Sequence, residues 1–103
     1  MKVIINNSEI ELKKSFRALI IYEEIMKESF TGSGYKELLI YFYSTILSSS
    51  KDIEISFDDF IDWLDDNPDS LNEFIKWLEK LGEKENIIKN KEDQPKKVDL
   101  KKN

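Results

Sequence analysis

The chain is 103 residues long, which is enough for one domain built around a single hydrophobic core. Hydrophobic residues make up 40% of it and charged residues 36%, a balance too apolar for a wholly disordered chain and too polar for a membrane protein. Cysteine and histidine are both absent, which removes disulfides, thiolate chemistry, the commonest general base and the commonest metal ligand. We therefore expect no catalytic site, no metal and no cofactor.

The net charge of −5 is distributed unevenly along the chain. Residues 1–82 hold 9 basic and 16 acidic side chains, whereas residues 83–103 hold 7 lysines and 5 acids. This change in composition predicts a single domain at 1–82 and a flexible, charged tail at 83–103. The acidic domain would repel a nucleic-acid backbone and favour a basic protein partner.

No segment of the sequence has the pattern of a membrane anchor or a secretion signal. The densest apolar run, residues 38–47, is about half the length that a bilayer requires. The first residues alternate into Glu9 and Glu11 and form no apolar signal core. We expect a cytoplasmic protein that has no contact with membranes.

The chain is predicted to begin with a β-hairpin. Residues 3–5 and 9–12 are rich in β-prone side chains, and the second segment alternates strictly between polar and apolar residues. Residues 6–8, Asn-Asn-Ser, tolerate the positive φ angles of a tight turn. Two strands alone are marginally stable, so this hairpin must pack on helices or pair with another chain.

Two helices are predicted next. The first spans residues 15–28 with Ser15 as its N-cap, and its apolar residues recur at helical spacing: Phe16, Leu19, Ile20, Tyr22 and Met26. Residues 29–34 contain two glycines and indicate a loop. The second helix starts near Tyr35 and has apolar residues on nearly every side, so it must be covered all round.

A third helix is expected after Ser56, which with Asp59 resembles a capping box, and it ends before Pro68. A fourth helix follows, with Ser70 as a possible cap and Gly82 as its stop. The expected buried faces are Phe57, Phe60, Ile61 and Leu64 in the third helix and Leu71, Phe74, Ile75, Leu78 and Leu81 in the fourth. The predicted fold is mainly α: a small four-helix domain with an N-terminal β-hairpin and a disordered C-terminal tail.

The third helix carries a row of acids. Asp58, Asp62 and Asp66 are spaced to share one face, and an acid in the first turn, such as Asp58, complements the helix dipole. Asp65 and Asp66 lie at the end of the helix, where the dipole opposes them, and they are the least explained acids. A solvated face is the simplest interpretation of the row. A docking surface for basic side chains and a catalytic or metal site are the alternatives.

The aromatic residues supply the other candidates for partner binding. Trp63 and Trp77 lie beside the apolar stripes of their helices, where core packing is the default interpretation. Tyrosine and tryptophan are, however, enriched among residues that dominate binding energy. The candidate partner-binding residues are Tyr41, Tyr43, Trp63, Asp65, Asp66 and Trp77.

The order of these features resembles a known family. A hairpin is followed by Ser-Phe-Arg-Ala at 15–18, Tyr-Glu at 22–23, Phe-Tyr at 42–43, Ser-Ser-Ser-Lys-Asp at 48–52 and the acidic segment 56–68. Over about residues 1–81 the chain resembles the small tail assembly chaperone-like proteins of tailed phages and prophages. The resemblance implies a non-enzymatic, mostly helical protein that binds the tape-measure protein and helps deliver tail tube subunits to it. The resemblance assigns no functional role to individual residues of this chain.

Two other functions remain open from the sequence. The chain could be an acidic regulatory or inhibitor protein that occupies a basic surface of its partner through Asp58, Asp62, Asp65 and Asp66. It could instead be a subunit of a small structural homo-oligomer that pairs through its hairpin.

Overall fold

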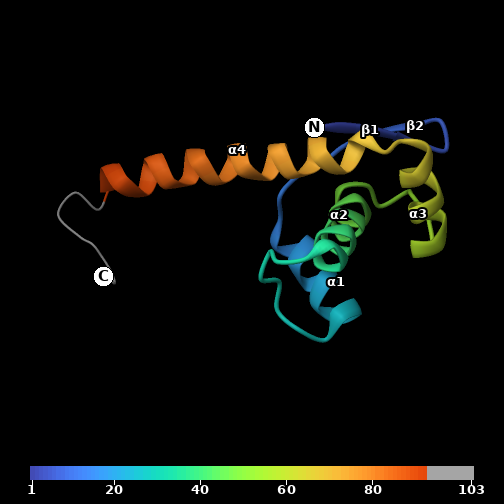
Figure 1. Cartoon of the computed structure of the whole chain (residues 1–103), viewed down its shortest axis with the longest axis horizontal. Helices are drawn as coiled ribbons and strands as arrows, with labels where there is room; N and C mark the ends of the chain where they lie inside the picture. The colour runs from blue at the N-terminus through green and yellow to red at the C-terminus, as the bar shows by residue number, and fades with distance from the viewer. Residues whose placement is uncertain (93–103) are drawn as a thin grey trace.

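The computed structural model describes the backbone of residues 1–92 and the side chains of residues 1–82. Its elements confirm a mainly α fold that opens with a two-stranded antiparallel hairpin. In chain order they are β1 (Lys2–Ile5), β2 (Ser8–Glu11), α1 (Phe16–Met26), α2 (Tyr35–Ser49), α3 (Phe57–Asp66) and α4 (Asp69–Glu92). Helix α2 lies in the middle of the fold, between α1 on one side and α4 with the hairpin on the other (Figure 1).

The hairpin closes through a two-residue turn. Asn6 and Asn7 both have positive φ, at 52° and 65°, as a tight hairpin turn requires. Ile5 therefore faces Ser8, and β2 begins one residue earlier than the alternation predicts. The Leu12 N–H donates to the Met1 carbonyl at 2.8 Å and adds a further rung. Every second side chain is buried, which fixes the register of the pair.

Helix α2 is the centre of the core. The expectation that it is covered all round holds for residues 40–46 but not for its first turn, where Tyr35 is exposed. Its buried residues are Ile40, Tyr41, Phe42, Ser44, Thr45 and Ile46. The two buried hydroxyls are satisfied within the helix, because the Oγ of Ser44 donates to the Ile40 carbonyl and the Oγ1 of Thr45 to the Tyr41 carbonyl, each at 2.7 Å. Both buried hydroxyls therefore have a hydrogen-bond partner.

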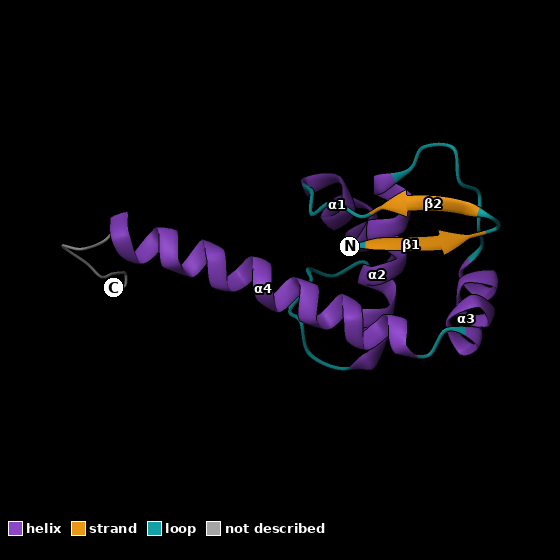
Figure 2. Cartoon of the chain, turned by 90° about the horizontal axis from the view of Figure 1, so that it is seen from above, coloured by secondary structure: helices purple, strands orange, loops and turns teal. Residues whose placement is uncertain are grey.

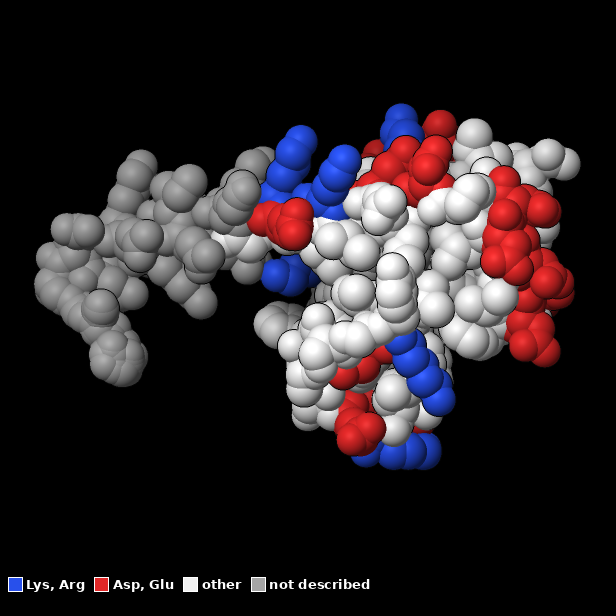
Figure 3. All heavy atoms as spheres, in the orientation of Figure 1, with Lys and Arg blue, Asp and Glu red and all other residues white. Residues whose placement is uncertain are grey.

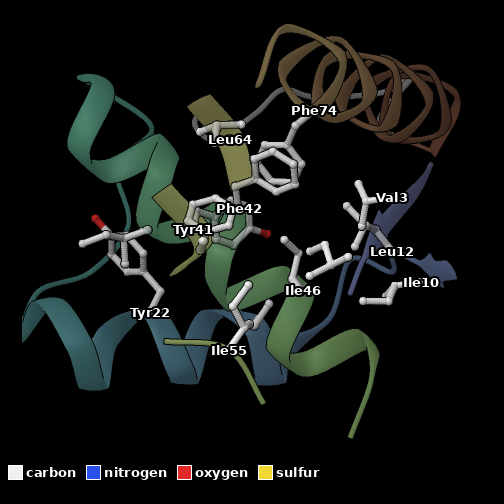
Figure 4. Close-up of a cluster of buried hydrophobic side chains, with 14 residues drawn as sticks. Val3, Ile10, Leu12, Tyr22, Tyr41, Phe42, Ile46, Ile55, Leu64 and Phe74 are labelled. Atoms are coloured by element: carbon white, nitrogen blue, oxygen red, sulfur yellow. The ribbon is translucent and has the colours of Figure 1, made fainter. Parts of the chain in front are cut away.

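An aromatic cluster joins α2 to α3 and α4. The Phe42 ring stacks on Phe74 with centroids 4.3 Å apart and meets Phe60 edge-on at 5.4 Å. All three side chains are completely buried. Figure 4 shows Phe42 and Phe74 meeting between α2 and α4. This cluster fixes the last two helices against the first half of the chain.

Helix α1 packs on α2 but buries only part of its apolar residues. Ser15 caps the helix as expected, since its Oγ accepts a hydrogen bond from the Ala18 N–H at 3.1 Å. Ala18 and Tyr22 are buried, but Phe16 is 85% exposed and Ile20 55% exposed. Helical spacing alone does not bury these last two residues, because α1 packs mainly on one helix, α2, and its apolar residues extend beyond that contact.

Helix α4 begins and ends differently from its prediction. Ser70 lies inside the first turn, since α4 begins at Asp69. The helix also continues through Gly82 to Glu92 and extends past the other elements (Figure 2). A glycine destabilises a helix by only about 1 kcal/mol relative to alanine, and no proline follows before Pro95. The helix therefore continues past Gly82, where it was expected to end. The remainder of the predicted tail, residues 93–103, lies outside the described residues.

Replacing Gly82 by alanine is expected to stabilise α4 by about 0.5–1 kcal/mol. Gly82 has no positive φ, and an added Cβ would meet no atom within 4 Å, so alanine removes backbone freedom from the unfolded chain at no steric cost. Helicity by circular dichroism and urea unfolding measure the gain. Gly34→Ala is the matched control of opposite sign, because Gly34 has a φ of +85° and alanine there is strained.

Candidate interaction surface

The acidic residues of α3 form an exposed face. Asp58, Asp59, Asp62, Asp65 and Asp66 are all exposed. Acidic side chains gather at the end of the molecule where α3 lies (Figure 3). The ion pairs recorded among the described side chains join Glu11 to the N-terminal ammonium and Glu9 to Lys2, so the α3 acids point into solvent.

Trp63 ties α3 to the hairpin. Its indole N–H donates to the Ile4 carbonyl at 2.8 Å, across 59 residues of sequence, and its ring meets Phe42 edge-on at 6.1 Å. The side chain is half-buried. A structural contact therefore accounts for its position beside the apolar stripe of α3.

The other aromatic candidates also lie in or against the core. Tyr41 is only 3% exposed and stacks on Phe30 at 4.3 Å, which leaves it no surface for a partner. Tyr43 is half-buried, its hydroxyl donates to the Ile55 carbonyl at 2.7 Å, and burial raises its pKa. The half-buried Trp77 packs on Phe74 at 5.8 Å. These residues do not converge with Asp65 and Asp66 on a single site.

An apolar surface that the sequence interpretation missed lies on α1. We call Phe16, Leu19 and Ile20 the α1 surface. Beside it is a shallow hollow of about 410 Å³, which Lys14 and Ser15 line together with Phe16 and Leu19. The sequence did carry a signal for this surface, since α1 has more large apolar residues than a single face can hold.

A second apolar surface lies where α2 begins. We call Tyr35, Leu38 and Ile75 the α2–α4 surface; with Gly34 they line a shallow hollow of about 300 Å³. Tyr35 is 74% exposed, and Leu38 and Ile75 are half-buried. Because Ser15 lies 3.4 Å from Ser48, α1 begins beside the end of α2. The two apolar surfaces therefore sit near opposite ends of α2.

Glu37 anchors the loop that leads into the α2–α4 surface. Its carboxylate accepts hydrogen bonds from the N–H and the Oγ1 of Thr31, each at 2.9 Å, and from the Oγ of Ser33 at 3.1 Å. These bonds lower the pKa of Glu37 to about 2. Burial of Tyr22, together with its hydrogen bond to Glu37, raises the pKa of that phenol to about 12. The network holds the loop in place directly before Tyr35.

Glu37→Gln is expected to lower the melting temperature at neutral pH. The pKa of Glu37 is depressed by folding, so its contribution is present above the ordinary value of 4.5 and is lost as the pH falls toward 2. Thermal unfolding at pH 7, 5 and 3 should therefore show a difference from the wild type that shrinks with acidification. Glu24→Gln, an exposed glutamate on α1, is the control. A difference that is the same at pH 7 and pH 3 would contradict this assignment.

No cluster of three or more acidic side chains in the described part is arranged to hold a metal ion. No helix there combines the length and hydropathy that a membrane span requires.

Comparison with known protein families, with curated proteins and with solved structures found no match to this chain.

Proposed function

We propose that the chain is a non-enzymatic binding protein that holds an apolar, helical segment of a client protein. More specifically, we propose that it is a phage or prophage tail assembly chaperone whose client is the tape-measure protein, the tail tube protein or both. It would act in the cytoplasm of the host cell. The family resemblance of residues 1–81 supports the specific identity, and the exposed apolar surfaces support the general activity.

The observation that carries the proposal is the α2–α4 surface. Tyr35 is held out in solvent at the first position of α2, and Leu38 and Ile75 line a hollow beside it. Tyrosines in this setting are frequent hot spots of binding, and an apolar helix seats its side chains in shallow grooves of this kind. The Glu37 network fixes the approach to the surface, so little ordering cost is added on binding.

Co-expression with tape-measure and tail tube proteins, if neighbouring genes encode them, tests the proposal. We expect at least one of them to co-purify with the chain or to become more soluble. Tyr35→Glu should weaken that association by roughly tenfold or more, because a charge replaces the exposed ring. Ile4→Lys, which changes an exposed apolar residue on the hairpin, should leave it unchanged. If neither protein is retained or solubilised, the chain is not a chaperone of this kind.

The acidic face of α3 favours a second candidate function, that of a regulatory or inhibitor protein for a basic partner. Asp58, Asp62, Asp65 and Asp66 are exposed and make no ion pair with a described residue. Binding through this face would weaken steeply with added salt. It would also be lost when the four aspartates are changed together to asparagine, whereas binding through the α2–α4 surface would persist.

A further inference from the structure

The α1 surface holds the most exposed large apolar side chain in the described part of the chain, Phe16 at 85%. Ile20 follows one turn later, and Leu19 connects the pair to the edge of the hollow. A capped helix that packs along α2 presents these side chains at fixed positions. Apolar side chains held rigidly in water are typical of a surface that another molecule covers.

The charges around this surface divide by sign along the helix. Lys13, Lys14 and Arg17 lie at the start of α1, and residues 12–22 contain no acid. Glu23, Glu24 and Glu28 lie toward its end, where Lys27 is the single basic residue. One end of the surface is therefore basic and the other is acidic.

This arrangement is the reverse of what stabilises an isolated helix. The first turn of α1 has no acid and the last turn has no base, so the charges oppose the helix dipole at both ends. Arg17, Glu23 and Glu24 also form no ion pair with any described residue. These three charges therefore have no ion-pair partner within the described part of the chain.

We propose that a second copy of this chain covers the α1 surface, with the two α1 helices antiparallel about a two-fold axis. Phe16 of each copy lies on Ile20 of the other, and Ile20 enters the hollow beside Phe16. Lys13 of each copy lies near Glu23 of the other. A two-fold contact of this kind is self-complementary, whereas parallel helices would place like charges together.

The size of the surface sets the strength of the dimer. Helix α1 has 11 residues and is roughly 16 Å long. Two such helices bury less than the roughly 1,200 Å² of a standard stable interface, so the dimer is weak and forms with rising concentration. The α2–α4 surface stays open in the dimer, because it lies near the other end of α2. This inference goes beyond the proposed function and does not depend on it.

Sedimentation equilibrium of the purified full chain, from micromolar to millimolar concentration, tests the pairing. The wild type is expected to pass from monomer to dimer over this range. The Phe16→Glu/Ile20→Glu double variant is expected to remain monomeric, and its circular dichroism should match the wild type because both side chains are exposed. Tyr35→Glu is the matched control and should dimerise like the wild type.

Charge reversal tests the orientation. Lys13→Glu and Glu23→Lys should each weaken the dimer several-fold, and the variant that carries both should recover it. A wild type that stays monomeric at millimolar concentration overturns the proposal. A dimer that survives the Phe16→Glu/Ile20→Glu change but is lost in Ile4→Lys also overturns it and places the contact on the hairpin. No client takes part, so these outcomes are separate from a failure of the chaperone proposal.

Discussion

Replacing Phe42 by alanine is expected to cost about 3–5 kcal/mol of unfolding free energy. The ring is completely buried and contacts the rings of Phe60, Trp63 and Phe74, so its removal leaves a cavity where α2, α3 and α4 meet. Domains of this size are stable by only about 5–15 kcal/mol, and the variant should lose much of that margin. Urea unfolding followed by circular dichroism measures the loss.

Phe16→Ala is the matched control for this prediction. It deletes the same ring from a position that is 85% exposed, so its cost should stay within about 0.5 kcal/mol at the low concentrations used for unfolding. Equal losses in the two variants would show that burial does not decide the contribution of these phenylalanines and would contradict the described core.

Trp63→Phe is expected to destabilise the chain by about 1–2 kcal/mol, and Trp63→Ala by about 3 kcal/mol. The first change removes the hydrogen bond to the Ile4 carbonyl and keeps an aromatic ring against Phe42, whereas the second also removes the packing. The loss of stability should be largest in β1, because the hydrogen bond of Trp63 joins this strand to α3. Amide hydrogen exchange of the hairpin is therefore the sensitive measurement, and it should become faster in Trp63→Phe.

Trp77→Phe provides the comparison. Trp77 packs on Phe74 but makes no hydrogen bond with a described residue, so its replacement should leave exchange in the hairpin unchanged. If Trp63→Phe leaves hairpin protection at the wild-type level, the tie between α3 and β1 is not a stabilising contact.

Much of the fold could be predicted because its signals are local. The paired asparagines predicted the hairpin turn, and Ser15 and Ser56 predicted the starts of α1 and α3. Pro68 predicted the break between α3 and α4. Each of these residues acts on backbone atoms a few positions away. The extension of α4 beyond Gly82 was not predicted, because a single glycine is a weak signal against a run of helix-forming residues.

The candidate site was harder to predict, because it depends on contacts that are distant in the sequence. Periodicity shows which apolar residues of α1 share a side of the helix, but not how far the contact with α2 extends, so the exposure of Phe16 and Ile20 was not predicted. Trp63 was a candidate for binding because its structural partner could not be predicted from local spacing. That partner, the Ile4 carbonyl, lies 59 residues earlier in the chain. Whether the candidate residues contact a partner stays a prediction.

The link between Trp63 and Ile4 also bears on the order in which the chain folds. The hairpin is synthesised first. Two residues whose hydrogen bonds secure it come much later in the chain: Ser49 accepts from the Lys13 N–H across 36 residues, and Trp63 donates to the Ile4 carbonyl across 59. Two strands are marginally stable alone, and closing so long a loop is entropically costly. We therefore expect the α1–α2 pair to form early and the hairpin to consolidate late, after α3 has left the ribosome.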